Sequence, residues 1–240
     1  MGNRDINMEK LSDIEDNTGV IPYHTESDNL HERKSVSYGI LGGTFNPIHN
    51  AHIELATAAL KQFHLDKVLL MPNNKPAYKS LYDIVSNEDR AEMVKLAVQG
   101  IDGLEFSDME LNRPGLTYTC DTLELLNMKY PQTEWYFIMG GDSIMYFDKW
   151  KEPEKIVRYA TLIVSVRNDI NKTTIHHKIE ELQSKYSGCR ILFEEMEAVD
   201  ISSSMLRKMI NMNEDVSSYM DKRVVDYIKD RQLYMINEGD

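Results

Sequence analysis

The sequence predicts an α/β fold, a Rossmann-like open parallel sheet of about six strands with helices on both faces and a helical C-terminal segment. Short apolar runs alternate along the chain with stretches whose apolar residues recur at helical spacing. The runs at 36–41 and 135–139 also stop at a pair of glycines. Strands separated by helices pair in parallel, so ligands are expected just beyond the carboxyl ends of the strands.

The first strand is expected at 36–41, where the apolar run precedes the first glycine pair. Apolar residues at helical spacing predict a helix over 51–63. A second buried strand is expected at 68–71. It should end at Pro72, because Pro lacks the backbone N–H that a central strand donates.

After a polar loop, a helix is expected over 87–99, with Asn87 as its N-cap because an Asn side chain can accept from the first free amides. The third strand is expected at 104–106. A helix over 119–130 should follow it and end before Pro131, which cannot continue a helix.

The fourth and fifth strands are expected at 135–139 and 160–166, and the sixth at 190–193. A helix over 175–186 should connect the last two strands, as in other right-handed crossovers of a parallel sheet. The last forty residues, from about residue 201, are expected to be wholly helical.

Composition limits the classes of function. The chain has 240 residues, with 27 basic and 39 acidic side chains and a net charge of −12. This balance argues against a nucleic-acid partner, which needs a surplus of Lys and Arg, but allows a small anionic substrate. No apolar run is long enough to predict a membrane span. The N-terminal stretch lacks the apolar h-region that would predict a secretory signal. Two cysteines, Cys120 and Cys189, are too few for a disulfide framework and predict a cytoplasmic protein.

Residues 1–36 differ from the rest of the chain. Eight acidic and four basic residues are scattered up to Ser37 without a steady period. Such composition favours an acidic, flexible extension, ahead of one domain at 37–240 with a helical part from about 201. A docking or regulatory arm is the alternative interpretation of residues 1–36.

A phosphate-binding loop is expected directly after the first strand. Gly42 and Gly43 let backbone amides approach an anion, and the following helix N-terminus adds partial positive charge. The stretch is neither a Walker loop nor a GxGxxG fingerprint. His49 and His52 are three residues apart, so their rings should face the same ligand. Half of a metal site, or two capping histidines without a ligand, are the alternatives.

A second anion site is expected at Ile201–Arg207. Three serines precede an apolar-periodic stretch, and Arg207 lies one turn inside the predicted helix, where its guanidinium can reach an anion. Alone, this pattern also fits an ordinary capped helix. Together with the first helix start it predicts a clamp for a polyphosphate.

These two stretches resemble motifs of the HxGH nucleotidyltransferase superfamily, G-G-T-F-D-P-[IV]-H-x-G-H and I-S-S-[ST]-x-[IL]-R. Between them, residues 71–79 and 112–123, and Gly140-Gly141-Asp142 with Trp150, are similar to the bacterial nicotinate-nucleotide adenylyltransferase family. The resemblance covers residues 37–234, nearly everything except the extension.

The resemblance implies a transferase of NAD biosynthesis. ATP would give its adenylyl group to nicotinate mononucleotide, forming deamido-NAD and pyrophosphate by in-line attack, without a covalent intermediate. It implies Mg²⁺ held mainly through the ATP phosphates, no resident metal, and leaves a homo-oligomer open. The residues that it implies for catalysis are His49, His52 and Arg207. Those for ATP are Gly42, Gly43, Thr44, Phe45, Asp142, Ile201, Ser203 and Ser204. Those for the mononucleotide are Lys79, Thr117, Tyr118, Thr119 and Trp150.

Three positions depart from the resembling pattern. Asn46 stands where the signature has Asp, so it keeps hydrogen-bonding geometry but cannot act as a base. Ala51 replaces Gly and adds a methyl group where adenine is expected to pack. Tyr78 replaces the His that precedes the loop lysine, Lys79, and this leaves the contacts of the mononucleotide phosphate open.

Two other functions remain open. A sibling enzyme of the same fold, such as pantetheine-phosphate adenylyltransferase or a cytidylyltransferase, would share the phosphate clamp. A nucleotide-binding regulatory protein without turnover would bind ATP and release no pyrophosphate. Among single residues, Trp150 could also be a half-buried core aromatic and Lys79 a solvated side chain. Cys120 is expected to be a small core residue.

Overall fold

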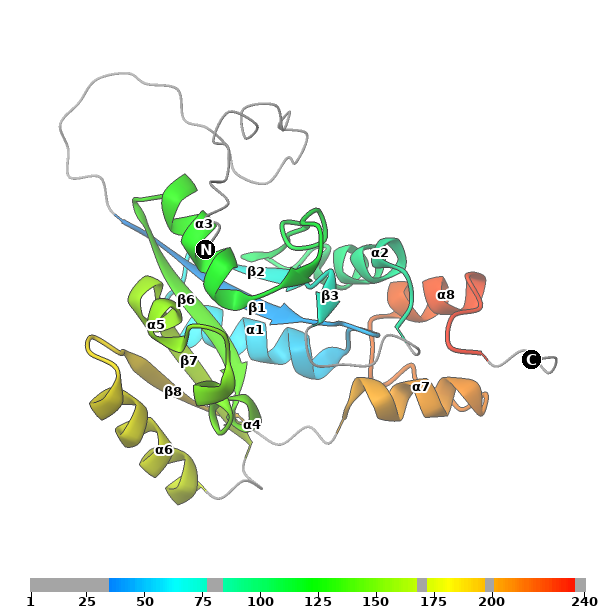
Figure 1. The fold of residues 1–240 in the computed structure, drawn as a ribbon. Helices are drawn as coiled ribbons and strands as arrows, with labels where there is room; N and C mark the ends of the chain where they lie inside the picture. Colours follow the sequence, from blue (N-terminus) through cyan, green and yellow to red (C-terminus); the bar gives the residue numbers. More distant parts are fainter. Residues whose placement is uncertain (1–34, 77–83, 168–171, 197–200, 236–240) are drawn as a thin grey trace, which may run out of the picture. The chain divides into compact units, whose positions relative to one another are not determined.

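The computed structural model describes residues 35–76, 84–167, 172–196 and 201–235, which all lie in one compact unit. Its centre is a six-stranded parallel sheet in the order β4-β2-β1-β6-β7-β8 (Figure 1). The predicted fold class is therefore confirmed. The strands are β1 Val36–Gly43, β2 Lys67–Pro72, β4 Leu104–Phe106, β6 Thr133–Gly140, β7 Ala160–Arg167 and β8 Ile191–Met196.

The direction of the chain reverses between β1 and β6. From β1 the chain moves outward through β2 to β4, and from β6 it moves the other way through β7 to β8. β1 and β6 are paired in parallel, with Leu41 opposite Ile138. Their carboxyl ends therefore form the topological switch point, where an open α/β sheet leaves a crevice for ligands.

Helices cover both faces. Right-handed crossovers place α1 Asn50–Gln62 and α2 Asn87–Val98 on one face. The opposite crossover direction places α3 Thr119–Lys129, α5 Pro153–Tyr159 and α6 Lys172–Lys185 on the other. α8 Lys222–Asp230 packs against α2 and follows α7 Ser203–Asn211 at the C-terminal end (Figure 1).

One large core fills the face of the sheet under α1 and α2. It contains fully buried residues of the sheet, such as Val68 and Leu70, together with Ala56 and Ala59 of α1. Leu206 of α7 and Val224 of α8 join the same cluster. The C-terminal helices are thus fixed to the sheet by apolar burial, which holds the start of α7 near the end of β1.

Two local predictions are wrong. The N-cap of α2 is Ser86, whose hydroxyl accepts from the Asp89 N–H at 3.0 Å, and the Asn87 side chain instead bonds Asn74. The last forty residues are not wholly helical. Asn213 has left-handed backbone (φ 56°) just after α7, and Asp221 starts α8 by accepting from the Arg223 N–H.

The structure also contains short elements that the sequence pattern did not predict. They are a two-stranded sheet of β3 Lys75–Pro76 and β5 Leu116–Thr117, the helix α5, and the single turns α4 Gly141–Ile144 and η2 Phe147–Lys149. The predicted extension at 1–36 lies almost wholly outside the described residues and stays a prediction. No helix in the described ranges is long and apolar enough to cross a membrane.

Candidate active site

The loop between β1 and α1 lies at the switch point. At its start a Cβ on Gly43 would come within 3.0 Å of the Phe45 ring, so a side chain there would displace that ring. Phe45 itself has left-handed backbone, with φ 47°, and its side chain is 1% exposed. The backbone of the loop is therefore folded into a tight, fixed shape over the core.

The two histidines lie face to face at the start of α1. Their rings stack with centroids 3.7 Å apart, and the His49 backbone N–H donates to Nδ1 of His52 at 3.3 Å. His49 is the N-cap of α1 and is 6% exposed. Since Nδ1 of His52 accepts, the neutral ring carries its proton on Nε2. The predicted pairing of His49 and His52 on one side of the helix start is confirmed.

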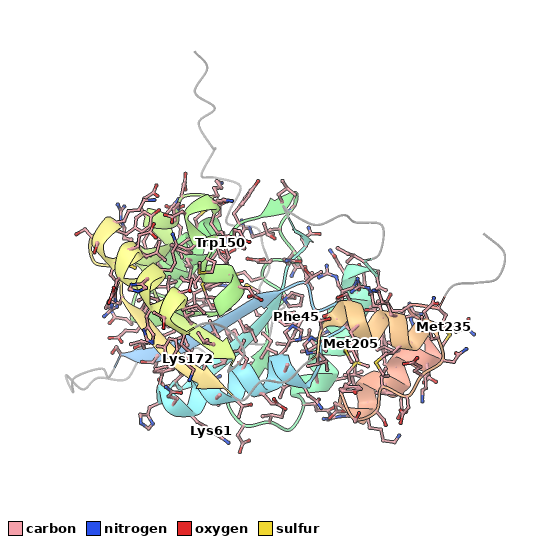
Figure 2. The ribbon with its side chains drawn as sticks, turned by 90° about the horizontal axis from the view of Figure 1, so that it is seen from below. Phe45, Lys61, Trp150, Lys172, Met205 and Met235 are labelled. Carbon is pink, nitrogen blue, oxygen red and sulfur yellow. The ribbon has the colours of Figure 1, made fainter. Side chains whose placement is uncertain are left out.

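The second predicted anion site approaches the same loop. The Ser203 hydroxyl donates to the Pro47 carbonyl, and Nη1 of Arg207 donates to the Asn46 carbonyl, each at 2.9 Å. In Figure 2 the loop with Phe45 lies beside α7, which carries Met205. The start of α7 and the start of α1 therefore form one site from two distant stretches of sequence.

The α7 start is capped by the first of the three serines. The Ser202 hydroxyl accepts from the Met205 N–H at 3.2 Å and lies 3.1 Å from the Ser204 hydroxyl. Ser204 is exposed, whereas Ile201 is 2% exposed and belongs to the core. Ile201, like Phe45, can therefore reach a ligand only through its backbone.

Asn46 is built into the interior of the loop. It is 4% exposed, and its side-chain oxygen accepts from the Val85 N–H at 3.2 Å and from the Tyr234 hydroxyl at 2.9 Å. Burial raises the pKa of Tyr234, so the phenol stays protonated and donates. Asn46, which stands where the signature has Asp, thus holds the loop in place through neutral hydrogen bonds.

A cavity of about 770 Å³ opens beside the ends of β1 and β6. Of the predicted ligand residues, it brings together Gly42, Gly43, Thr117, Tyr118, Thr119, Asp142 and Trp150. It also contains side chains that sequence analysis missed. These are Asn73, which directly follows β2, and Glu110, Ser143, Tyr146, Lys149 and Lys151. The strand-end rule could have identified Asn73, whereas no local pattern marks Glu110.

The N-terminus of α3 faces this cavity. Its N-cap residue, Tyr118, makes no side-chain cap, and Thr119 follows as the first helical residue. The first amides of a helix have no acceptor within it and favour an anion. Thr117, just before the cap, is 8% exposed. A ligand carboxylate would fit this helix start.

A polar network that includes side chains lining the cavity holds the same helix start. The Thr122 hydroxyl donates to Glu110, and Nη1 of Arg113 donates to Thr122, both at 2.6 Å. Burial raises the pKa of the Glu110 carboxyl. Lys151 bonds Asp121 at 3.0 Å and lies over the Tyr118 ring, 4.6 Å from its centroid.

Trp150 forms part of the wall of the cavity. It is half-buried against Phe137 and Phe147, with ring centroids 5.9 Å and 5.7 Å away. The preceding turn is anchored to α6 because Asp148 accepts from Lys178, Lys185 and the Tyr186 hydroxyl. Trp150 is thus both a packed aromatic and part of the cavity surface, so the two interpretations from sequence are compatible.

Lys79 lies outside the described residues, as does Tyr78, so the structure does not place either of them. Cys120 is fully buried, and burial raises the pKa of its thiol to about 11. A neutral, buried thiol is not a nucleophile, which agrees with its expected role in the core.

The fold and the paired helix starts at the switch point define a nucleotide-binding α/β enzyme. The chain belongs to the cytidylyltransferase-like family, whose model matches residues 40–209. Within it, the chain is 39% identical over 197 residues to a probable nicotinate-nucleotide adenylyltransferase of Lachnoclostridium phytofermentans, covering 82% of this chain and 98% of the relative. A protein of the same description from Clostridium acetobutylicum is 36% identical over 196 residues, with the same coverage.

Solved structures share the fold. A Plasmodium falciparum nicotinic acid mononucleotide adenylyltransferase complexed with NaAD matches 83% of this chain and 97% of its own, with a TM-score of 0.69 and 22% identity. The same protein complexed with APC has a TM-score of 0.67. The family resemblance predicted from the motifs is confirmed.

Proposed function

We infer that the chain is a nicotinate-nucleotide adenylyltransferase, which joins ATP and nicotinate mononucleotide into deamido-NAD and releases pyrophosphate. Curated relatives that align over nearly their whole length support this activity. The observation that carries it in this chain is the meeting of two half-sites at the switch point. One is a loop between two helix starts, and the other is a cavity that ends at a third helix start.

The loop half suits the triphosphate of ATP. The backbone of residues 42–45 and the free amides at the start of α7 supply neutral donors, and Ser203 and Ser204 lie at that start. Arg207 supplies a positive charge next to the loop, and His49 and His52 offer ring nitrogens. In this proposal these three side chains stabilise the charge that develops on the α-phosphate and on the leaving pyrophosphate.

The cavity half suits the pyridine nucleotide. The amides at the start of α3, near Tyr118 and Thr119, would take the nicotinate carboxylate. Trp150 would stack on the pyridine ring, and Asp142 would lie at the adenosine side of the cavity. A site built for a carboxylate leaves those amides unpaired when the ligand carries an uncharged amide, which favours nicotinate over nicotinamide. The contact of Lys79 with the mononucleotide phosphate stays a prediction.

The reaction needs positioning more than proton transfer. An oxygen of the mononucleotide phosphate forms a bond to the α-phosphorus of ATP while the bond from that phosphorus to the bridging oxygen of pyrophosphate breaks. A phosphate monoester is already largely dianionic at pH 7, since its second pKa is about 6. No general base is therefore required, and an Asn at position 46 does not interfere with the chemistry.

Mg²⁺ would enter this site as a partner of ATP. Among the described residues, the group with metal-binding geometry is Cys120, Asp121 and Glu152, and Asp121 is already bonded to Lys151. A neutral thiol is a poor ligand for Mg²⁺, which prefers oxygen and water. The ion would be held mainly by ATP oxygens and water and would neutralise phosphate charge.

Pyrophosphate release distinguishes the candidate functions. ATP and Mg²⁺ are mixed with nicotinate mononucleotide, nicotinamide mononucleotide or phosphopantetheine, and pyrophosphate is measured with the full chain. Strong preference for nicotinate mononucleotide is expected. Preference for phosphopantetheine would overturn the pyridine assignment and favour a sibling enzyme. ATP binding without release from any acceptor would favour the regulatory protein. Location in the cytoplasm and a homo-oligomer stay predictions from composition and resemblance.

A further inference from the structure

Arg90 of α2 is a fully buried cation behind the loop that follows β1. Its exposed fraction is 0%. Nη1 donates to the Thr44 carbonyl at 2.9 Å, and Nη2 donates to the Asn74 carbonyl at 3.2 Å and to the side-chain oxygen of Asn87. All three acceptors are neutral, so these bonds orient the guanidinium without cancelling its charge.

Asp89, the preceding residue, does not pair with Arg90, and Glu88 acts on Arg90 through its charge alone, which raises the pKa of the guanidinium against the effect of burial. Asp89 accepts instead from Ser86, from the Tyr227 hydroxyl at 2.9 Å and from Arg231 at 3.2 Å. Within the described part of the chain, Arg90 has no ion pair with a carboxylate. A guanidinium stays protonated even when burial lowers its pKa. A buried charge whose hydrogen-bond acceptors are all neutral is unfavourable, so an anion that binds nearby would be attracted.

The bond to Thr44 also sets the direction of a peptide group. The C=O of Thr44 and the N–H of Phe45 belong to one peptide and point in opposite directions. Because Arg90 holds the carbonyl, the Phe45 N–H is turned away from Arg90. A charged donor on the carbonyl polarises the peptide and strengthens that N–H as a donor.

We propose that Arg90 is a positioning residue for the ATP phosphates. It fixes the Thr44–Phe45 peptide and places a buried positive charge behind the loop, which attracts the bound polyphosphate. This role rests on the proposed function of the loop as the triphosphate site.

Asn46 adds no negative charge near the Arg90 guanidinium. Its side-chain oxygen accepts from the Tyr234 hydroxyl, which lies in the electrostatic field of both Arg90 and Arg207. A carboxylate at this position, as the resembling signature carries, would lie close to both guanidinium groups and reduce their attraction for phosphate. Asn46→Asp is therefore a substitution that lowers the positive potential while Arg90 stays in place.

The first experiment compares Arg90→Gln with Arg90→Lys and with Arg158→Gln, an exposed arginine of α5. Arg90→Gln is expected to raise the KM for ATP by about 10-fold, the effect of losing one charge-assisted hydrogen bond, and to leave the KM for nicotinate mononucleotide within about twofold. Arg90→Lys, which keeps the charge, should recover part of the loss. Equal rises in both KM values, or a wild-type KM for ATP, would overturn the proposal.

The second experiment measures ATP binding without turnover, and its Asn46→Asp variant leaves Arg90 in place. The ATP-induced rise in melting temperature is measured for wild type, Arg90→Gln and Asn46→Asp, without the second substrate. Both variants should show a smaller rise than wild type. If Arg90→Gln does not fold, Asn46→Asp decides, and an unchanged rise and KM for ATP in that variant would overturn the proposal. Absence of pyrophosphate release by wild type would instead overturn the proposed reaction, while this ATP-binding comparison would still test Arg90.

Discussion

The two halves of the site are built in different ways. In the loop half, side chains from other elements hold backbone carbonyls: Arg90 bonds Thr44, Arg207 bonds Asn46, and Ser203 bonds Pro47. In the cavity half, side chains bond one another through the Glu110–Thr122–Arg113 network and the Asp121–Lys151 pair, and aromatic rings supply the surface. The first half is a shaped backbone and the second is an assembly of side chains.

This difference has a consequence for how each half tolerates change. A shaped backbone offers neutral donors that any phosphate can use, so its chemistry depends on the few charged or ring nitrogens added to it. A side-chain assembly sets which second substrate fits, because each polar group must find its partner. Loss of a catalytic side chain in the loop half should lower turnover, whereas loss of a side chain in the cavity half should weaken the binding of one substrate.

The largest expected effect is in the loop half. His52→Ala should lower kcat about 100-fold or more, because it removes a preorganised donor whose ring is fixed by the stack on His49. His177→Ala is the matched control, since that imidazole is 75% exposed on α6. Steady-state kinetics with both substrates measure the change. Wild-type kcat in His52→Ala would remove the histidines from the proposed mechanism and with them the contrast between the halves.

A smaller and more selective effect is expected in the cavity half. Trp150→Ala should raise the KM for nicotinate mononucleotide about 10-fold or more, since stacking on an aromatic side chain contributes about 1–3 kcal/mol per ring. The KM for ATP should change little. Trp150→Phe keeps an aromatic face and should recover most of the affinity. A rise confined to the KM for ATP would place Trp150 in the other half of the site and break the comparison.

The loop half was also the half that the sequence predicted best. Its residues from Gly42 to His52 are contiguous and directly follow a strand, so the strand-end rule and the helix dipole identify them without tertiary information. The α7 start was predicted from its three serines and the apolar-periodic stretch that follows them. Arg90 was missed because nothing in the helical pattern around it distinguishes a buried cation from a solvated one.

The cavity half depends on contacts that no local pattern contains. Glu110 and Lys151 come from loops, and their partners become visible only when the chain brings the segments together. The predicted N-cap of α2 was also off by one residue, because two residues that can cap a helix are adjacent there. Ser86 rather than Asn87 caps α2, since the Asn87 side chain has a tertiary partner in Asn74.

The smallest expected effect concerns the anchor of the cavity wall. Asp148 ties η2, which precedes Trp150, to α6 by accepting from two lysines and a tyrosine. Asp148→Asn should loosen this attachment at a cost of about 1 kcal/mol, because the pairs are partly exposed and screened. The KM for the mononucleotide should rise by less than in Trp150→Ala. Asp226→Asn, which removes the carboxylate of an exposed pair on α8, is the matched control.

The pH dependence of stability distinguishes the anchor from a general loss of packing. The bonds from Lys178 and Lys185 hold the pKa of Asp148 well below its usual range. Its contribution to stability is therefore complete above the unfolded pKa of about 3.9 and is lost as the pH falls through the folded pKa. The stability of wild type should exceed that of Asp148→Asn at pH 7, and the difference should shrink toward pH 3. Movement of the cavity wall is measured by the fluorescence of Trp150. A Trp135→Phe background removes the other tryptophan of the chain. A gap between the variants that stays constant with pH would mean that Asp148 acts through packing rather than charge, and the cavity half would then resemble the loop half in depending on shape.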